Sequence, residues 1–78
     1  MKTMTCKQLG GACDLEFHAD TFEEIEEQSK QHGMEMFQKG DRPHLDAMQK
    51  MKQLMTSASD MKAWVDSKRT EFEALPND

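Results

Sequence analysis

The chain has 78 residues, which is the size of one small domain, and such a domain buries only about 60 to 65% of the surface that its unfolded chain exposes. Domains this small are usually stabilised by a disulfide, a metal ion or self-association. The formal net charge is −5 and no cluster of lysines and arginines occurs, which argues against a protein that binds nucleic acid through phosphate contacts.

The beginning of the chain has a lysine but lacks the apolar run that a secretory signal needs, and no segment approaches the length of a membrane span. We therefore expect a small acidic cytoplasmic protein without a membrane partner. Disulfides are uncommon in the cytoplasm, so this expectation favours reduced thiols or metal ligands for the two cysteines, Cys6 and Cys13.

Alternating apolar and polar residues predict two short β-strands, over residues 3–7 and 13–18. The strands flank a turn at residues 9–12. Gly10 and Gly11 would supply the positive φ angles that a tight reversal requires. This segment is therefore expected to form a β-hairpin.

Helix signals follow the hairpin. Thr21 and the glutamate three residues later form a capping-box pattern, and Gly40 marks the end of this first helix. Asp41 is the expected cap of a second helix, which has a proline in its first turn. Residues 57–60 carry the capping pattern of a third helix, and Pro76 ends it.

These elements predict an α+β fold of the order ββααα. A two-stranded N-terminal β-hairpin packs on a long helix, and two further helices complete the core. We expect residues 1–78 to form a single domain, in which residues 1–40 are the hairpin with the first helix and residues 41–78 are a helical extension.

Side-chain direction brings the cysteines into a candidate site. Because strand side chains alternate between faces, directing Leu15 and Phe17 toward the helices also directs Cys13 inward, and Cys6 shares the inward face of its own strand. His32 lies on the inward stripe of the first helix. The strand from Asp20 back to Cys13 covers roughly 23 Å, and the helix from Thr21 to His32 returns roughly 17 Å.

Cys6, Cys13 and His32 can therefore converge on one point, as the ligands of a ββα zinc-finger-like site do. Three ligands do not complete a tetrahedral site. Of the positions about one helical turn after His32, Met36 is on the right face, and its thioether suits Cu(I) better than zinc. His18 has the wrong strand parity, and His44 is interpreted as a surface histidine.

The stretch M-K-T-M-T-C-K-Q-L-G-G-A-C-D, followed by an acidic helix containing Q-H-G, resembles a family of short prokaryotic proteins called domain of unknown function 1059. Its members are labelled predicted small metal-binding proteins. The resemblance is clearest over residues 1–40, and the remainder resembles the helical extension of a longer subset. It implies a hairpin-and-helix domain without an established activity.

The resemblance also implies ligands: Cys6 and Cys13 match the cysteines of the family, and His32 matches its helix histidine. Many members have another histidine about one turn later, where this chain has Phe37. Two outcomes are consistent with that departure. Either the site has three protein ligands and a water, or these side chains pack as ordinary core.

Three states of the cysteines stay open at this stage: ligands of zinc or another soft metal, reduced core thiols, or a disulfide. We do not expect an enzyme or a small-molecule substrate. No oxyanion donors can be identified beside the Cys-His pair, and the cysteine spacing is not the C-x-x-C of a redox site.

Eight methionines give an alternative function. Helical spacing places most of them in the core, but methionine also forms adaptable contact surfaces. A structural or interaction module would use such a surface for self-association as a homo-oligomer or for an amphipathic partner helix. The residues of this expected surface are Met48, Met51, Met55, Met61 and Trp64.

Overall fold

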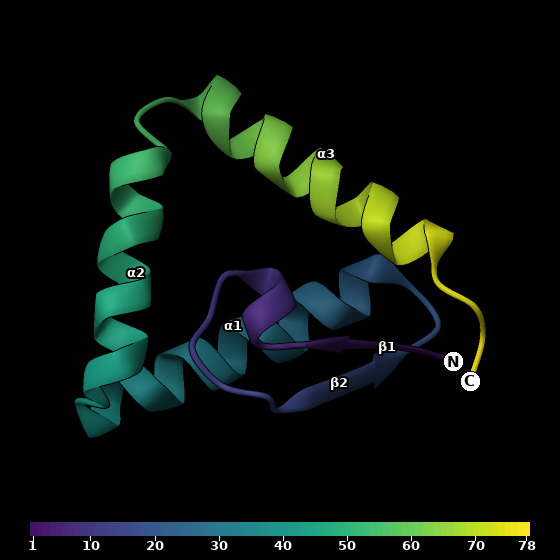
Figure 1. The fold of residues 1–78 in the computed structure, drawn as a ribbon, viewed down its shortest axis with the longest axis horizontal. Helices are drawn as coiled ribbons and strands as arrows, with labels where there is room; N and C mark the ends of the chain where they lie inside the picture. Colours follow the sequence, from purple (N-terminus) through teal and green to yellow (C-terminus); the bar gives the residue numbers. More distant parts are fainter.

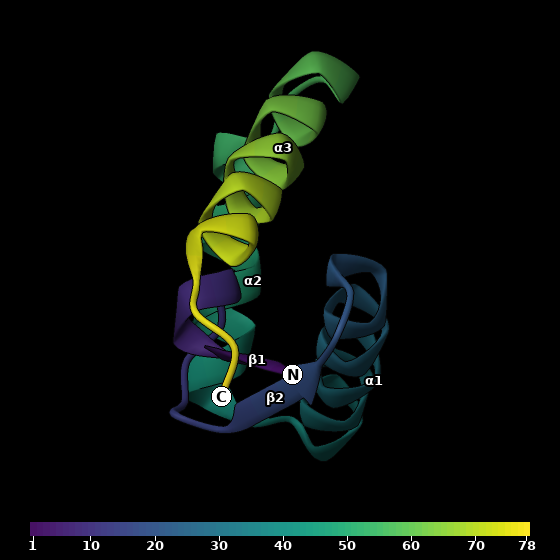
Figure 2. The ribbon, with the colours of Figure 1, turned by 90° about the vertical axis from the view of Figure 1, so that its right-hand side faces the viewer.

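The computed structural model describes all 78 residues and has the predicted ββααα order. Figure 1 shows the three helices as the sides of a triangle, with the hairpin strands beside the longest of them, and in Figure 2 this helix lies along one side of the hairpin. The elements are β1 (Lys2–Thr5), a short 3₁₀ turn η1 (Lys7–Leu9), β2 (Glu16–Ala19), α1 (Phe22–Lys39), α2 (Arg42–Leu54) and α3 (Ala58–Ala74).

The two strands pair antiparallel, and Met4 lies opposite Phe17 in the register. Both strands are shorter than predicted, so Cys6 and Cys13 lie in the connection between them and not in the strands. Cys6 turns into an αR conformation that starts η1. Its amide still donates to the carbonyl of Leu15 at 2.9 Å, so the connection stays tied to the hairpin.

The shorter strands change the direction of some side chains. Leu15, which strand parity directed inward, is 48% exposed, because β2 begins only after it. Phe17 is inside β2 and is buried as predicted. Gly10 has the predicted positive φ of 88°, whereas Gly11 does not have a positive φ. A positive φ is therefore not what requires a glycine at position 11. The glycine is required because a side chain there would collide with Cys6.

The predicted helix ends are confirmed. Thr21 caps α1 by accepting a hydrogen bond from the Glu24 amide, and Gly40 ends the helix with a φ of 69°. The Asp41 carboxylate caps α2, and the Ser57 hydroxyl caps α3. These short polar side chains satisfy amide groups that the first turn of a helix leaves without partners.

The apolar core joins the hairpin, the first turns of α1 and the end of α3, but it takes no residue from α2. The one buried residue of α2 is a histidine, His44. None of the helices combines the length and the apolar character needed to cross a lipid bilayer. The core residues are Met4, Cys6, Leu9, Phe17, Ala19, Phe22, Ile25 and Phe72.

Candidate metal centre

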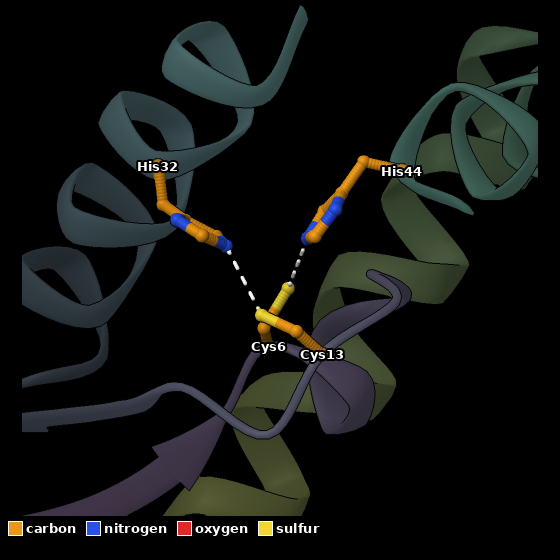
Figure 3. A group of neighbouring side chains, drawn as sticks. All are labelled: Cys6, Cys13, His32 and His44. Carbon is orange, nitrogen blue, oxygen red and sulfur yellow. Dashed lines mark hydrogen bonds between the residues drawn. The ribbon is translucent and has the colours of Figure 1, made fainter. Parts of the chain in front are cut away.

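Four side chains meet between the hairpin connection, α1 and α2. They are Cys6, Cys13, His32 and His44, and their four ligand atoms all lie within 4.8 Å of one another. In Figure 3 the two sulfurs come from the connection, while the two imidazoles approach them from α1 and α2. The convergence of both thiols and His32, predicted from side-chain direction, therefore occurs in the structure.

Two sulfur–nitrogen separations are close to those of a tetrahedral metal site. Cys13 Sγ lies 3.3 Å from His32 Nε2, and Cys6 Sγ lies 3.6 Å from His44 Nε2. Around a zinc ion with bonds of about 2.3 Å to sulfur and about 2.05 Å to nitrogen, a tetrahedral angle places sulfur and nitrogen about 3.6 Å apart. One ion could therefore contact all four atoms after small adjustments.

The double glycine between the cysteines is explained by two different contacts. A Cβ atom on Gly11 would lie 2.1 Å from Cys6 Sγ and 3.0 Å from the Cys6 carbonyl oxygen, so the sulfur occupies the space that a side chain would need. The Gly11 amide also donates to that carbonyl at 2.8 Å. Gly10 supplies the positive φ and is covered by Met51 and Trp64.

The interpretation of His44 as a surface histidine is wrong, because its residue is only 6% exposed and its Nε2 faces the cysteines. Asp41 holds the ring in this position. The same carboxylate oxygen accepts from the His44 amide at 3.2 Å and lies 2.5 Å from His44 Nδ1. A proton on Nδ1 leaves Nε2 free as a ligand, as in the carboxylate–histidine pairs around many metal sites.

Asp41 and His44 each stabilise the charged form of the other. The hydrogen bond from His44 lowers the pKa of the Asp41 carboxyl, and the same bond raises the pKa of the His44 imidazole. A carboxylate at the N-terminus of α2 is also favoured by the helix dipole. The short sequence D-R-P-H thus both starts the helix and orients the His44 imidazole.

The two thiols differ in their environment. Burial raises the pKa of Cys6. Burial acts in the same direction on Cys13, but the polar influence of the Leu15 backbone and of the nearby His44 imidazole outweighs it and lowers the pKa of this thiol. Both cysteines are free thiols in the structure. Cys13 therefore reaches the thiolate form, which binds metals, more readily than Cys6 does.

The other candidate ligands lie in different places. Met36 is half-buried on α1 one turn after His32, and the fourth side chain of the cluster comes instead from His44 on α2. Phe37 is 65% exposed. His18 is exposed, as its strand parity predicted, and pairs with the Thr3 hydroxyl at 2.8 Å.

The residues of the expected interaction surface are divided between two environments. Met51 and Trp64 pack over Gly10, and Met48 lies near Gly33. Met55 is half-buried, whereas Met61 is 55% exposed. Part of this set is therefore used within the molecule, and its role in binding a partner stays a prediction.

His44 could not be found by spacing within one motif, since it comes from a helix that folds back on the hairpin. A signal for it was present locally. Asp41 caps the helix three residues before His44, and a side chain at this position of the first turn lies close to the capping carboxylate. A histidine oriented in this way by a carboxylate is typical of a metal ligand.

The fold and the site together define a small α+β protein with a Cys2His2 cluster placed to hold a metal ion. Residues 1–37 match the family described as "Protein of unknown function (DUF1059)", which confirms the resemblance seen in the sequence. The match includes three residues of the cluster and ends before His44. Comparisons with curated proteins and with solved structures found no match.

Gly11→Ala tests the packing of the Cys6 sulfur. The new methyl group would force the sulfur or the connection to move, so we expect the free energy of unfolding to fall by about 1 to 3 kcal/mol, measured by urea denaturation of the metal-free protein. Gly33→Ala is the matched control, because its Cβ would meet only Met48 Cε at 3.9 Å. Equal stability of the Gly11→Ala variant and the unmodified protein would contradict this packing.

Proposed function

We propose that the protein is a small, non-enzymatic metal-binding protein that holds one zinc ion through Cys6, Cys13, His32 and His44. The observation that carries the proposal is the approach of four ligand atoms to within 4.8 Å of one another from residues far apart in the sequence. Two thiolates and two imidazoles in tetrahedral arrangement form a typical structural zinc site.

The burial of His44 favours metal binding over a core of reduced thiols. A 13-residue helix is held against the rest of the protein with a histidine as its one buried residue, where an apolar side chain would contribute more by simple burial. The core itself contains eight apolar residues in a chain of 78. A metal ion would supply the additional stabilisation that so small a domain needs.

The chemistry of the ligands favours zinc among the metals. Calcium and magnesium prefer oxygen ligands, which this cluster lacks, whereas thiolate and imidazole together suit zinc. With four protein ligands no coordination position is left for a substrate or an activated water, and this supports a non-enzymatic role. A reducing compartment such as the cytoplasm would keep both thiols available to the metal.

A zinc titration tests the ligand set. We expect the metal-free protein to bind one equivalent of zinc and to melt at a higher temperature when loaded, because an ion that binds only the folded state stabilises it. Cys6→Ser, Cys13→Ser and His44→Ala should each weaken the affinity at least about tenfold, measured by competition with a chromophoric chelator. His18→Ala is the control, since this exposed histidine lies outside the cluster.

Two results would contradict the proposal. One is a metal-free protein whose melting temperature responds neither to zinc nor to a chelator. The other is a His44→Ala variant with the zinc affinity of His18→Ala, since that result would show that the buried histidine is no ligand.

Asp41→Asn tests whether the carboxylate orients His44. Asparagine is also a good helix cap, so the stability of the metal-free protein should change little. Loss of the charged acceptor at His44 Nδ1 should weaken zinc binding by about 10- to 100-fold. Ser57→Ala, which removes the cap of α3, should do the reverse and lower stability without changing the affinity. If Asp41→Asn lost only stability, the carboxylate would be a cap and nothing more.

A further inference from the structure

α2 packs on the rest of the molecule mainly through half-buried side chains and one buried histidine. Its one buried residue is His44, and the apolar residues along its inner face, such as Met48 and Met51, are only half-buried. α1 and α3, in contrast, contribute phenylalanines to the core, Phe22 and Phe72, whose rings contact each other edge to face. The position of α2 therefore depends on a polar residue.

Without a metal, that residue is a weak anchor. His44 Nδ1 is paired with Asp41, which belongs to the start of the same helix, so this bond does not hold α2 to anything else. Across the interface His44 Nε2 meets Cys6 Sγ at 3.6 Å, a weak hydrogen-bond partner, and the His44 ring meets the His32 ring of α1 edge to face, with the centroids 5.1 Å apart. A metal ion would replace this contact by bonds to both segments.

The segments that join α2 to α1 and to α3 are mostly exposed. It follows α1 after Gly40, whose φ of 69° suits glycine, and nothing lies within 4 Å of the place where a Cβ on Gly40 would be. At its other end the residues that lead into α3 are mostly exposed. α3 is fixed at its far end, where the Lys2 ammonium donates to the Phe72 carbonyl at 3.2 Å.

We infer that metal coordination holds α2 against the hairpin connection, and we call this interaction the metal clasp. Loss of the metal then releases α2, while the hairpin, α1 and the end of α3 stay folded. The inference rests on the proposed function. Only the docked form presents all four ligands, so saturating zinc should shift docking by the ratio of the zinc affinities of the docked and undocked forms, which loss of the His44 ligand sets at about tenfold or more.

Release of α2 would change the surface of the protein. In the docked form Met51 and Trp64 cover Gly10, and a cavity of about 240 Å³ between the connection, α1 and α2 is lined by Cys6, His44 and Met48 among others. Undocking opens this cavity and exposes the methionines of α2. The metal would thus control which apolar surface the protein presents.

Hydrogen–deuterium exchange of the full chain tests the clasp. In saturating zinc, amides of α2 should exchange at least about tenfold more slowly than in the metal-free protein, whereas amides of β1 and the first turns of α1 should change much less. Equal protection of α2 in the two forms would overturn the inference. That result with zinc bound would leave the proposed function intact, whereas a chain that binds no zinc would remove both.

A pair of ligand variants separates the clasp from metal binding in general. His32→Ala and His44→Ala each remove one imidazole, but only the second removes the ligand that α2 supplies. At zinc concentrations that saturate each variant, α2 should be protected in His32→Ala and unprotected in His44→Ala. Equal zinc-dependent protection of α2 in both variants would overturn the inference, because α2 would then dock without its ligand.

Discussion

The contact between Cys6 Sγ and the backbone at Gly11 fixes the position from which the rest of the site is built. Because no side chain exists at Gly11, the connection can fold tightly around the sulfur and bring Cys13 beside it. α1 then supplies His32 from one side, and α2 supplies His44 from the other. α1 and α2 are therefore both placed against these groups, while α3 packs on the small apolar core.

Capping and helix-ending signals in short stretches of sequence were sufficient to predict much of the fold. The caps at Thr21, Asp41 and Ser57 and the glycine at the end of α1 are properties of short stretches of sequence, and all lie where the sequence placed them. The α+β order follows from these signals. The inward direction of Cys6 was also predicted correctly, although the cysteine lies just beyond the strand.

The errors concern contacts that local patterns do not encode. Leu15 was placed inward because alternation was extended beyond the true start of β2. Gly11 was assigned a positive φ, although the sulfur of a residue five positions earlier is what requires a glycine. His44 reaches the cysteines only because α2 folds back after Gly40, and spacing cannot show such a return. In each case the decisive contact is tertiary.

Binding of one metal ion by two thiols and two imidazoles underlies both the proposed function and the docking of α2. X-ray absorption at the zinc edge, on protein loaded with one equivalent of zinc, measures these bonds directly. We expect two sulfur atoms at about 2.3 Å and two nitrogen atoms at about 2.0 to 2.1 Å from the zinc ion. A coordination shell of oxygen and nitrogen alone, or of four sulfurs shared between two molecules, would contradict it.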